Sequence, residues 1–307
     1  MITTAKRTEA LAAEIKSLAA RKNALILAHN YQREEVQAVA DYTGDSLELA
    51  RIAADTAADI IVFCGVHFMA ESAAILNPGK KVLLPDPTAG CPMADMAGPE
   101  DLAAMRERNP DASVVTYINS SAEVKALSDV CCTSANAVKI VQRVDARRVI
   151  FVPDRNLGSW VQRFTDKEVI LWDGFCPTHE RFTAADLAEA KRLHPDALVM
   201  VHPECNPEVI DMADEVLSTG QMVKFVRETD RAKIIVGTEE GMIHKLKSVA
   251  PEREYILPSK ALVCPNMKKT TLEKVHAALV NEGPIVTVDP EVREKSLGCL
   301  RRMLKLS

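Results

Sequence analysis

The sequence has few aromatic residues and no excess of positive charge. Phe, Trp and Tyr make up 4% of its 307 residues, and the formal net charge at pH 7 is −5. A nucleic-acid-binding protein usually presents a basic surface, together with aromatic rings on which bases stack. Neither feature is indicated here, so we expect no nucleic-acid partner.

Long apolar runs are also missing. The most apolar stretch, Ile60–Val66, has seven residues, whereas a transmembrane helix needs about 20. Near the N-terminus, charged residues from Lys6 to Lys16 interrupt the apolar ones, which predicts an amphipathic helix and not a signal peptide. We therefore expect a cytoplasmic protein with no membrane partner. In a reducing compartment its eight cysteines are typical of buried thiols or metal ligands.

Two glycine-rich nucleotide-binding patterns are absent as well. No Gly-x-Gly-x-x-Gly follows a predicted strand and no Gly-x-x-x-x-Gly-Lys occurs, so dinucleotide or ATP binding is not indicated. The chain instead alternates short β-branched runs with helical patterns, which predicts a parallel α/β architecture. The expected strands are Ala24–His29, Asp59–Cys64, Lys81–Leu84, Ser113–Ile118, Arg148–Val152, Glu168–Trp172, Ala197–His202, Lys233–Val236 and Glu254–Leu257.

Three stretches of the chain share one order of residues. Offsets of 88 and 85 positions align Tyr31, Asn119 and Glu204; Val36, Val124 and Val209; Asp41, Asp129 and Asp214; and Asp45, Thr133 and Ser218. Each stretch ends in Cys-Pro, at Cys91, Cys176 and Cys264. Several columns in one register predict three units of about 85 residues, each too small to hold a large core alone and therefore packed on the others.

We therefore expect three αβα domains related by a pseudo-threefold axis, with parallel sheets around a central site. The predicted domains are residues 1–98 with 284–307, residues 99–183 and residues 184–283. The C-terminal segment from about Pro284 is expected to return to the first domain.

Such symmetry would bring Cys91, Cys176 and Cys264 together near the axis. Three thiolates without Cys-x-x-Cys pairs suit zinc, copper(I) or an iron–sulfur group with one coordination position left open. The alternative is three buried cysteines at domain junctions. The remaining cysteines are interpreted as structural: Cys64, Cys131, Cys132, Cys205 and Cys299.

Seven segments carry a recognisable pattern: Ala28–Gln32, Gly44–Ser46, Tyr117–Ser120, Cys131–Asn136, Pro153–Gly158, His202–Cys205 and Ser218–Gly220. They resemble the quinolinate synthase A-protein family, and the resemblance runs from about residue 20 to residue 300. It implies three similar αβα domains around an oxygen-sensitive 4Fe–4S cluster. Cys91, Cys176 and Cys264 match its three ligands, which leaves one iron free to act as a Lewis acid.

The resemblance also implies an activity. The reaction would be a transferase-type condensation of iminoaspartate (iminosuccinate) with dihydroxyacetone phosphate to quinolinate, releasing phosphate and water, in the biosynthesis of NAD and other pyridine nucleotides. An aspartate oxidase or dehydrogenase would hand over the iminoaspartate. Some relatives carry cysteines three and six residues before the third ligand; Ala261 and Pro258 stand there, so a disulfide switch at this place is not available.

Residues at the predicted strand ends are the candidates for the chemistry. The resemblance assigns Tyr31 and Glu204 to proton transfer during phosphate loss, and an anionic cluster beside Glu204 is expected to raise its pKa. His29, His202 and His179 are candidates for carboxylate binding or proton transfer. We expect the substrate to be bound by His29, Ser46, Tyr117, Ile118, Asn119, Ser134, His202, Pro203, Glu204 and Thr219. For each residue alone, a structural hydrogen bond is the alternative; recurrence at the carboxyl ends of parallel strands favours ligand binding.

The repeat predicts an anion-binding floor. Asp45, Thr133 and Ser218 are expected N-caps, which would place the residues after them in the first turns of three helices, where free N–H groups favour anions. Those residues are Ser46, Ser134 and Thr219. The run Met267–Thr270 is interpreted as a solvated face. A lysine in it could add positive electrostatic potential at a site that binds anions.

Two other classes of function stay open at this point. One is a zinc-stabilised structural or binding protein, with three cysteines and a histidine such as His179 as ligands. The other is electron transfer, which favours a closed cluster with four cysteine ligands.

Overall fold

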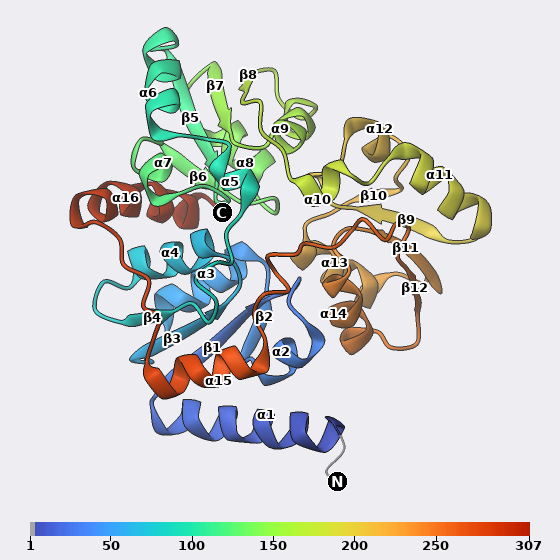
Figure 1. Ribbon diagram of the computed structural model, residues 1–307. Coiled ribbons are helices and arrows are strands. Elements are labelled where there is room, and N and C mark those ends of the chain that lie inside the picture. The colour runs from blue at the N-terminus through green and yellow to red at the C-terminus, as the bar shows by residue number, and fades with distance from the viewer. Residues whose placement is uncertain (1–3) are drawn as a thin grey trace.

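The computed structural model describes residues 4–307 and shows three units of one topology (Figure 1). The predicted first domain begins with residues 1–3, which lie outside the described residues. Each unit contains a four-stranded parallel sheet with helices packed on it. The predicted α/β fold with three parallel sheets is confirmed.

The elements follow the same order in each unit. The first comprises α1 (Thr4–Arg21), β1 (Ala24–His29), α2 (Glu34–Val39), β2 (Tyr42–Gly44), α3 (Ser46–Asp55), β3 (Ile60–Cys64), α4 (His67–Leu76), β4 (Lys81–Leu83) and α5 (Pro92–Asp95). The second comprises α6 (Pro99–Arg108), β5 (Ala112–Tyr117), α7 (Ala122–Ala126), β6 (Val130–Cys132), α8 (Ala137–Arg143), β7 (Arg148–Val152), α9 (Arg155–Gln162), β8 (Glu168–Leu171) and α10 (Pro177–Glu180). The third comprises α11 (Ala184–Leu193), β9 (Leu198–Val201), α12 (Pro207–Ile210), β10 (Glu215–Val216), α13 (Thr219–Glu228), β11 (Lys233–Gly237), α14 (Gly241–Val249) and β12 (Glu254–Ile256).

The strand order is the same in all three sheets. It is β2-β1-β3-β4 in the first unit, β6-β5-β7-β8 in the second and β10-β9-β11-β12 in the third. Every pairing is parallel. The first and third strands of each unit are therefore central, and their apolar side chains are buried between helices, as parallel sheets require.

A recurring aspartate ties the first two strands of each sheet together. A carboxylate oxygen of Asp41 accepts a hydrogen bond of 2.7 Å from a backbone N–H of β1. Asp129 and Asp214 accept the same bond from β5 and β9, at 2.7 and 2.8 Å. The valine column is fully buried as well: Val36, Val124 and Val209. The repeat in the sequence is thus a structural repeat.

The predicted helix starts are confirmed in the first and third units and are wrong in the second. Asp45 and Ser218 cap α3 and α13, each in a capping box. Thr133 is not an N-cap: the side chain of Asn136 accepts the Thr133 N–H at 2.6 Å, and Asn136 itself has a φ of −127°. α8 therefore begins after Asn136. Ser134 lies in the preceding turn, so the prediction that it occupies a first helical turn is wrong.

Two C-terminal helices join the units. α15 (Leu272–Asn281) packs against α1 and β3, and α16 (Pro290–Leu306) packs against α7 and β6 of the second unit and α4 of the first (Figure 1, orange and dark red). Between them, Pro284 accepts a hydrogen bond from Leu84 just after β4. The limits of the three domains stay predictions. The predicted third domain includes α15, but this helix packs on the first unit.

None of the helices in residues 4–307 is long and apolar enough to cross a membrane.

Candidate active site

A cavity of about 150 Å³ lies among residues that follow the carboxyl ends of strands from all three units. Most residues predicted for the site line it: His29, Tyr31, Ser46, Cys91, Tyr117, Asn119, Ser134, Cys176, His179, His202, Glu204, Thr219 and Cys264. Ile118 and Pro203 are buried and do not line it, and Ile118 packs in the main hydrophobic core. The three units therefore meet at one common site.

The cysteines Cys91, Cys176 and Cys264 are placed alike. Cys91 and Cys176 immediately precede α5 and α10, and all three are followed by proline. Backbone N–H groups two or three residues further along face each sulfur. Burial raises the pKa of all three thiols, that of Cys91 to about 12. A metal would reverse this effect because it binds the thiolate; these soft donors therefore fit an iron–sulfur group or zinc.

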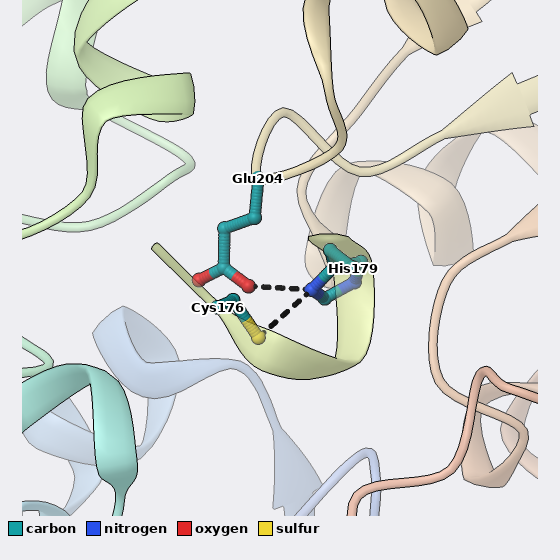
Figure 2. A group of neighbouring side chains, drawn as sticks. All are labelled: Cys176, His179 and Glu204. Atoms are coloured by element: carbon teal, nitrogen blue, oxygen red, sulfur yellow. Dashed lines mark hydrogen bonds and ion pairs between the residues drawn. The ribbon is translucent and has the colours of Figure 1, made fainter. Parts of the chain in front are cut away.

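His179 lies between a cysteine and a carboxylate (Figure 2). Its Nδ1 is 2.8 Å from Glu204 Oε2 and 3.2 Å from Cys176 Sγ. The three side chains form a group whose possible ligand atoms all lie within 4.8 Å of one another. Glu204 comes from the loop after β9, whereas Cys176 and His179 come from the start of α10. The site thus joins the second and third units.

Glu204 is a buried acid with partners on both carboxylate oxygens. Its Oε1 accepts a hydrogen bond of 2.6 Å from the Tyr117 hydroxyl. Burial opposes the negative charge, but the adjoining His202 and His179 and the hydrogen bonds from His179 and Tyr117 outweigh it, so the pKa of Glu204 lies below its usual range. The expectation of a raised pKa concerned the charge of a bound cluster and stays a prediction; the protein's own groups lower the pKa of Glu204.

Two further histidines are neutral at physiological pH. Burial lowers the pKa of His29 to about 4 and that of His202 to about 3. The His202 ring stacks on that of His179 with centroids 5.0 Å apart, and its Nε2 lies 3.2 Å from Ser134 Oγ. His29 and His202 can therefore hydrogen-bond a carboxylate, but they do not offer it a positive charge.

The first and third units meet at the starts of α3 and α13. Asp45 Oδ1 accepts hydrogen bonds of 2.9 Å from Leu47 and Glu48, and the Gly220 N–H also faces the Asp45 carboxylate. A Cβ on Gly220 would lie 2.6 Å from Asp45 Oδ2, so only glycine permits this approach. Burial raises the pKa of Asp45 to about 6. Ser46 and Thr219, the first residues of the two helices, are thereby held on one wall.

Sequence analysis missed Glu239, which follows β11 and lines the cavity. Its Oε1 accepts the Cys264 N–H at 3.0 Å, and its Oε2 accepts the Gly241 N–H at 2.7 Å. Lys268 Nζ lies 2.9 Å from Glu239 Oε1 and donates a bond of 2.9 Å to the Tyr31 carbonyl. The interpretation of Lys268 as part of a solvated face is therefore wrong.

The repeat in the sequence could have indicated that Glu239 belongs to the site. The residue 85 positions earlier is Asp154, two residues after β7, and the Cys176 N–H faces its buried carboxylate. The same column thus lies against the backbone of Cys176 in the second unit and of Cys264 in the third. Comparing the residues after the third strand of each unit would have found both acids.

The other cysteines lie away from the cavity. All five are buried and none lines it: Cys64, Cys131, Cys132, Cys205 and Cys299. Cys131 Sγ lies 2.9 Å from Cys299 Sγ, where α16 packs on β6. This placement agrees with a structural role for the five.

Comparison with known proteins agrees with this geometry. The chain matches the family described as "Quinolinate synthetase A protein" over residues 13–305. It is 54% identical to the quinolinate synthase of Geobacter sp. (strain M21) over 298 residues, which cover 97% of this chain and 98% of that protein. The identity is 54% over 293 residues with that of Geobacter metallireducens (95% and 96% covered) and 52% over 294 residues with that of Thermodesulfovibrio yellowstonii (95% and 97% covered). Given the three cysteines, the shared cavity and this near full-length similarity, the chain belongs to the quinolinate synthetase A-protein family of enzymes.

Proposed function

We propose that this enzyme condenses iminoaspartate with dihydroxyacetone phosphate to quinolinate, with loss of phosphate and water. The observation that carries the proposal is that three cysteines and the acid–base candidates Tyr31 and Glu204 line one cavity. An aspartate oxidase or dehydrogenase would supply the iminoaspartate. The relatives named above support the assignment by their names.

The cysteines Cys91, Cys176 and Cys264 would hold a 4Fe–4S cluster with one open iron. A single zinc ion with Zn–S bonds of about 2.3 Å needs sulfurs about 3.8 Å apart. Among the described residues, the group with ligand atoms within 4.8 Å of one another contains only Cys176 of the three. The wider spacing supports a larger group. When bound, the cluster would supply a Lewis-acidic iron to a substrate oxygen.

Tyr31 and Glu204 would begin the reaction in opposite protonation states. Burial and the nearby Glu204 charge raise the pKa of Tyr31 well above its usual value, so the phenol is protonated. Glu204 is ionised. Tyr31 can therefore donate a proton and Glu204 can accept one, which the loss of phosphate and the later loss of water both require.

The hydroxyls of Ser46, Ser134 and Thr219 would bind the anionic groups of the substrates. All three line the cavity. Ser46 and Thr219 begin the ten-residue helices α3 and α13, where the positive end of the helix dipole favours negative charge. Asn30 Nδ2 donates a bond of 3.0 Å to Thr219 Oγ1 and fixes that hydroxyl. Two carboxylates and a phosphate need several such donors.

A zinc protein is the second candidate, because Cys176, His179 and Glu204 alone could hold one ion. One experiment separates the two. Protein purified without oxygen is analysed for iron, sulfide and zinc, and is then assayed with iminoaspartate and dihydroxyacetone phosphate. We expect a brown protein, about four irons and four sulfides per chain, and quinolinate formation. A colourless zinc protein that forms no quinolinate would refute the proposal.

A further inference from the structure

Cys131 and Cys299 lie in contact although they are 168 positions apart in the chain. Cys131 is the middle residue of β6, and Cys299 lies on α16. Their Sγ atoms are 2.9 Å apart, and both side chains are buried. Packed carbon atoms stay about 3.5–4.0 Å apart, and sulfur is larger than carbon. The two sulfurs are thus closer than unbonded atoms usually are, and an S–S bond of about 2.05 Å needs only a small further approach.

A buried lysine lies beside the pair. Lys125 of α7 is fully buried, and its Nζ donates a bond of 2.6 Å to the Ser120 carbonyl. Burial raises the pKa of the Cys299 thiol well above its usual value, whereas the charge of Lys125 acts in the opposite direction. The Cys299 thiol is therefore protonated while it is packed, and it becomes a reactive thiolate when water reaches it beside this cation.

The hydrogen bonds that hold α16 on the second unit lie at the surface. Arg302 donates a bond of 2.7 Å to the Asp129 carbonyl, and Arg143 donates one of 2.7 Å to the Leu306 carbonyl. Both bonds are exposed to solvent. Exposed contacts of this kind open locally while the sheets stay folded. Such an opening admits a molecule as small as hydrogen peroxide to Cys299, and its closure returns the two sulfurs to contact.

We propose that Cys131 and Cys299 form a site of reversible oxidation, at which a disulfide fastens α16 to β6. The oxidant is a peroxide. The Cys299 sulfur bonds to one oxygen of hydrogen peroxide, the O–O bond breaks, and the other oxygen leaves as water with the thiol proton. The Cys131 sulfur then displaces the oxygen of this sulfenic acid, which leaves as a second water with the Cys131 proton.

These steps balance. The two sulfurs together give up two electrons and two protons, and one hydrogen peroxide takes them up to become two waters. A dithiol reductant reverses the oxidation by exchange: its own sulfurs form a disulfide and Cys131 and Cys299 regain their protons. The reaction requires none of the groups that line the central cavity, so the proposal is independent of the function proposed above.

The disulfide would support one wall of the cavity through a short stretch of chain. β6 ends at Cys132, and the next two residues, Thr133 and Ser134, line the cavity. Asn136 accepts the Thr133 N–H at 2.6 Å and donates a bond of 2.6 Å to Ser307 Oγ, directly after α16. The strand before this turn and the helix end beside it would thus be joined covalently, which holds the turn in place while the protein meets an oxidant.

The test treats protein purified without oxygen with hydrogen peroxide, blocks the remaining thiols with an alkylating agent, and maps the unreduced peptides by mass spectrometry. We expect Cys131 joined to Cys299 as the main cystine, and its loss after dithiothreitol. The oxidised protein should unfold about 5 °C above Cys299→Ala treated alike, because the bond closes a long loop of the unfolded chain. Cys132→Ala is the matched control: its side chain points to the other face of β6, so this variant should form the bond as wild type does.

The decisive measurement is made on the wild-type chain, so it does not depend on whether a variant folds. Cys131 and Cys299 recovered as alkylated thiols, or as sulfinic acids without a link, would overturn the proposal. A link from Cys299 to Cys132 would also overturn it, because the strand would then present the other thiol to α16. An unfolding temperature equal to that of treated Cys299→Ala would show that the bond does not fasten the helix. Quinolinate formation tests the proposed function separately.

Discussion

The Tyr117 hydroxyl donates a hydrogen bond of 2.6 Å to Glu204 Oε1, and this bond crosses from the second unit to the third. Tyr117 is the last residue of β5 and Glu204 follows β9, the first strands of their units. Tyr117 was predicted to contact substrate; in the structure its hydroxyl also holds the proposed base. With His179 on the other oxygen, Glu204 is fixed from both sides before any substrate binds.

Tyr31→Phe and Glu204→Gln should each lower kcat by about 10²–10⁴-fold, because each removes a group that donates or accepts a proton. Both substitutions keep the shape of the side chain. Iron content and thermal stability should therefore stay close to those of wild type, which a visible spectrum and a melting curve would show. Rates within a few-fold of wild type for both variants would exclude the two residues from the chemistry.

Replacing Cys91, Cys176 or Cys264 by Ser should abolish retention of the cluster, because a hard oxygen is a poor substitute for a soft thiolate. Iron and sulfide per chain measure this directly. Cys64→Ser and Cys205→Ser are matched controls, since both cysteines are buried outside the cavity. These controls should lose stability only. If Cys205→Ser lost the cluster while Cys264→Ser kept it, the ligands would be misassigned.

Alanine at Ser46, Ser134 or Thr219 should weaken quinolinate binding about tenfold, the usual effect of losing a hydrogen bond to a charged group. Anaerobic calorimetry gives the Kd. Ser218→Ala is the control: it removes the cap of α13 and should cost about 1 kcal/mol of stability without changing the Kd. Unchanged affinity in all three cavity variants would contradict the anion-binding floor.

The ion pair of Glu239 and Lys268 offers a test of packing. Glu239 is fully buried, and the Lys268 side chain is 14% exposed. Lys268→Met should destabilise the fold by about 3 kcal/mol, because it leaves a buried carboxylate without its cation. Adding Glu239→Gln should restore most of the loss, as denaturant unfolding would show. A double variant that is no more stable than Lys268→Met would mean that the charge is not the cause.

Asp45 should make stability depend on pH. Its pKa is raised to about 6 in the folded chain, so folding favours the protonated carboxyl. That contribution is complete below about pH 4, the unfolded pKa, and is lost as the pH rises through 6. From pH 4 to pH 7, wild-type protein should lose about 3 kcal/mol relative to Asp45→Asn. Asp55→Asn, at the exposed end of α3, is the control and should show no such difference from wild type in denaturant unfolding.

The sequence alone determined the repeat, the fold class and the three cysteines. Columns such as Asp41, Asp129 and Asp214 could be read from it because each makes a local bond, to the strand just before it, and a local bond recurs at a fixed spacing. The Cys-Pro ends recur for the same reason: each is placed by its own unit.

The tertiary structure decided what depends on the packing of one unit on another. The contact of His179 with Glu204 follows from no pattern in the sequence, because the two residues come from the second and third units. The pKa of Glu204 likewise follows from neighbours brought by two units and not from its place in the chain. Even Ser134, correctly placed in the repeat, lies before its helix because Asn136 bonds back to Thr133. Spacing in sequence reports local bonds; the orientation of side chains across a domain junction arises only when the units pack.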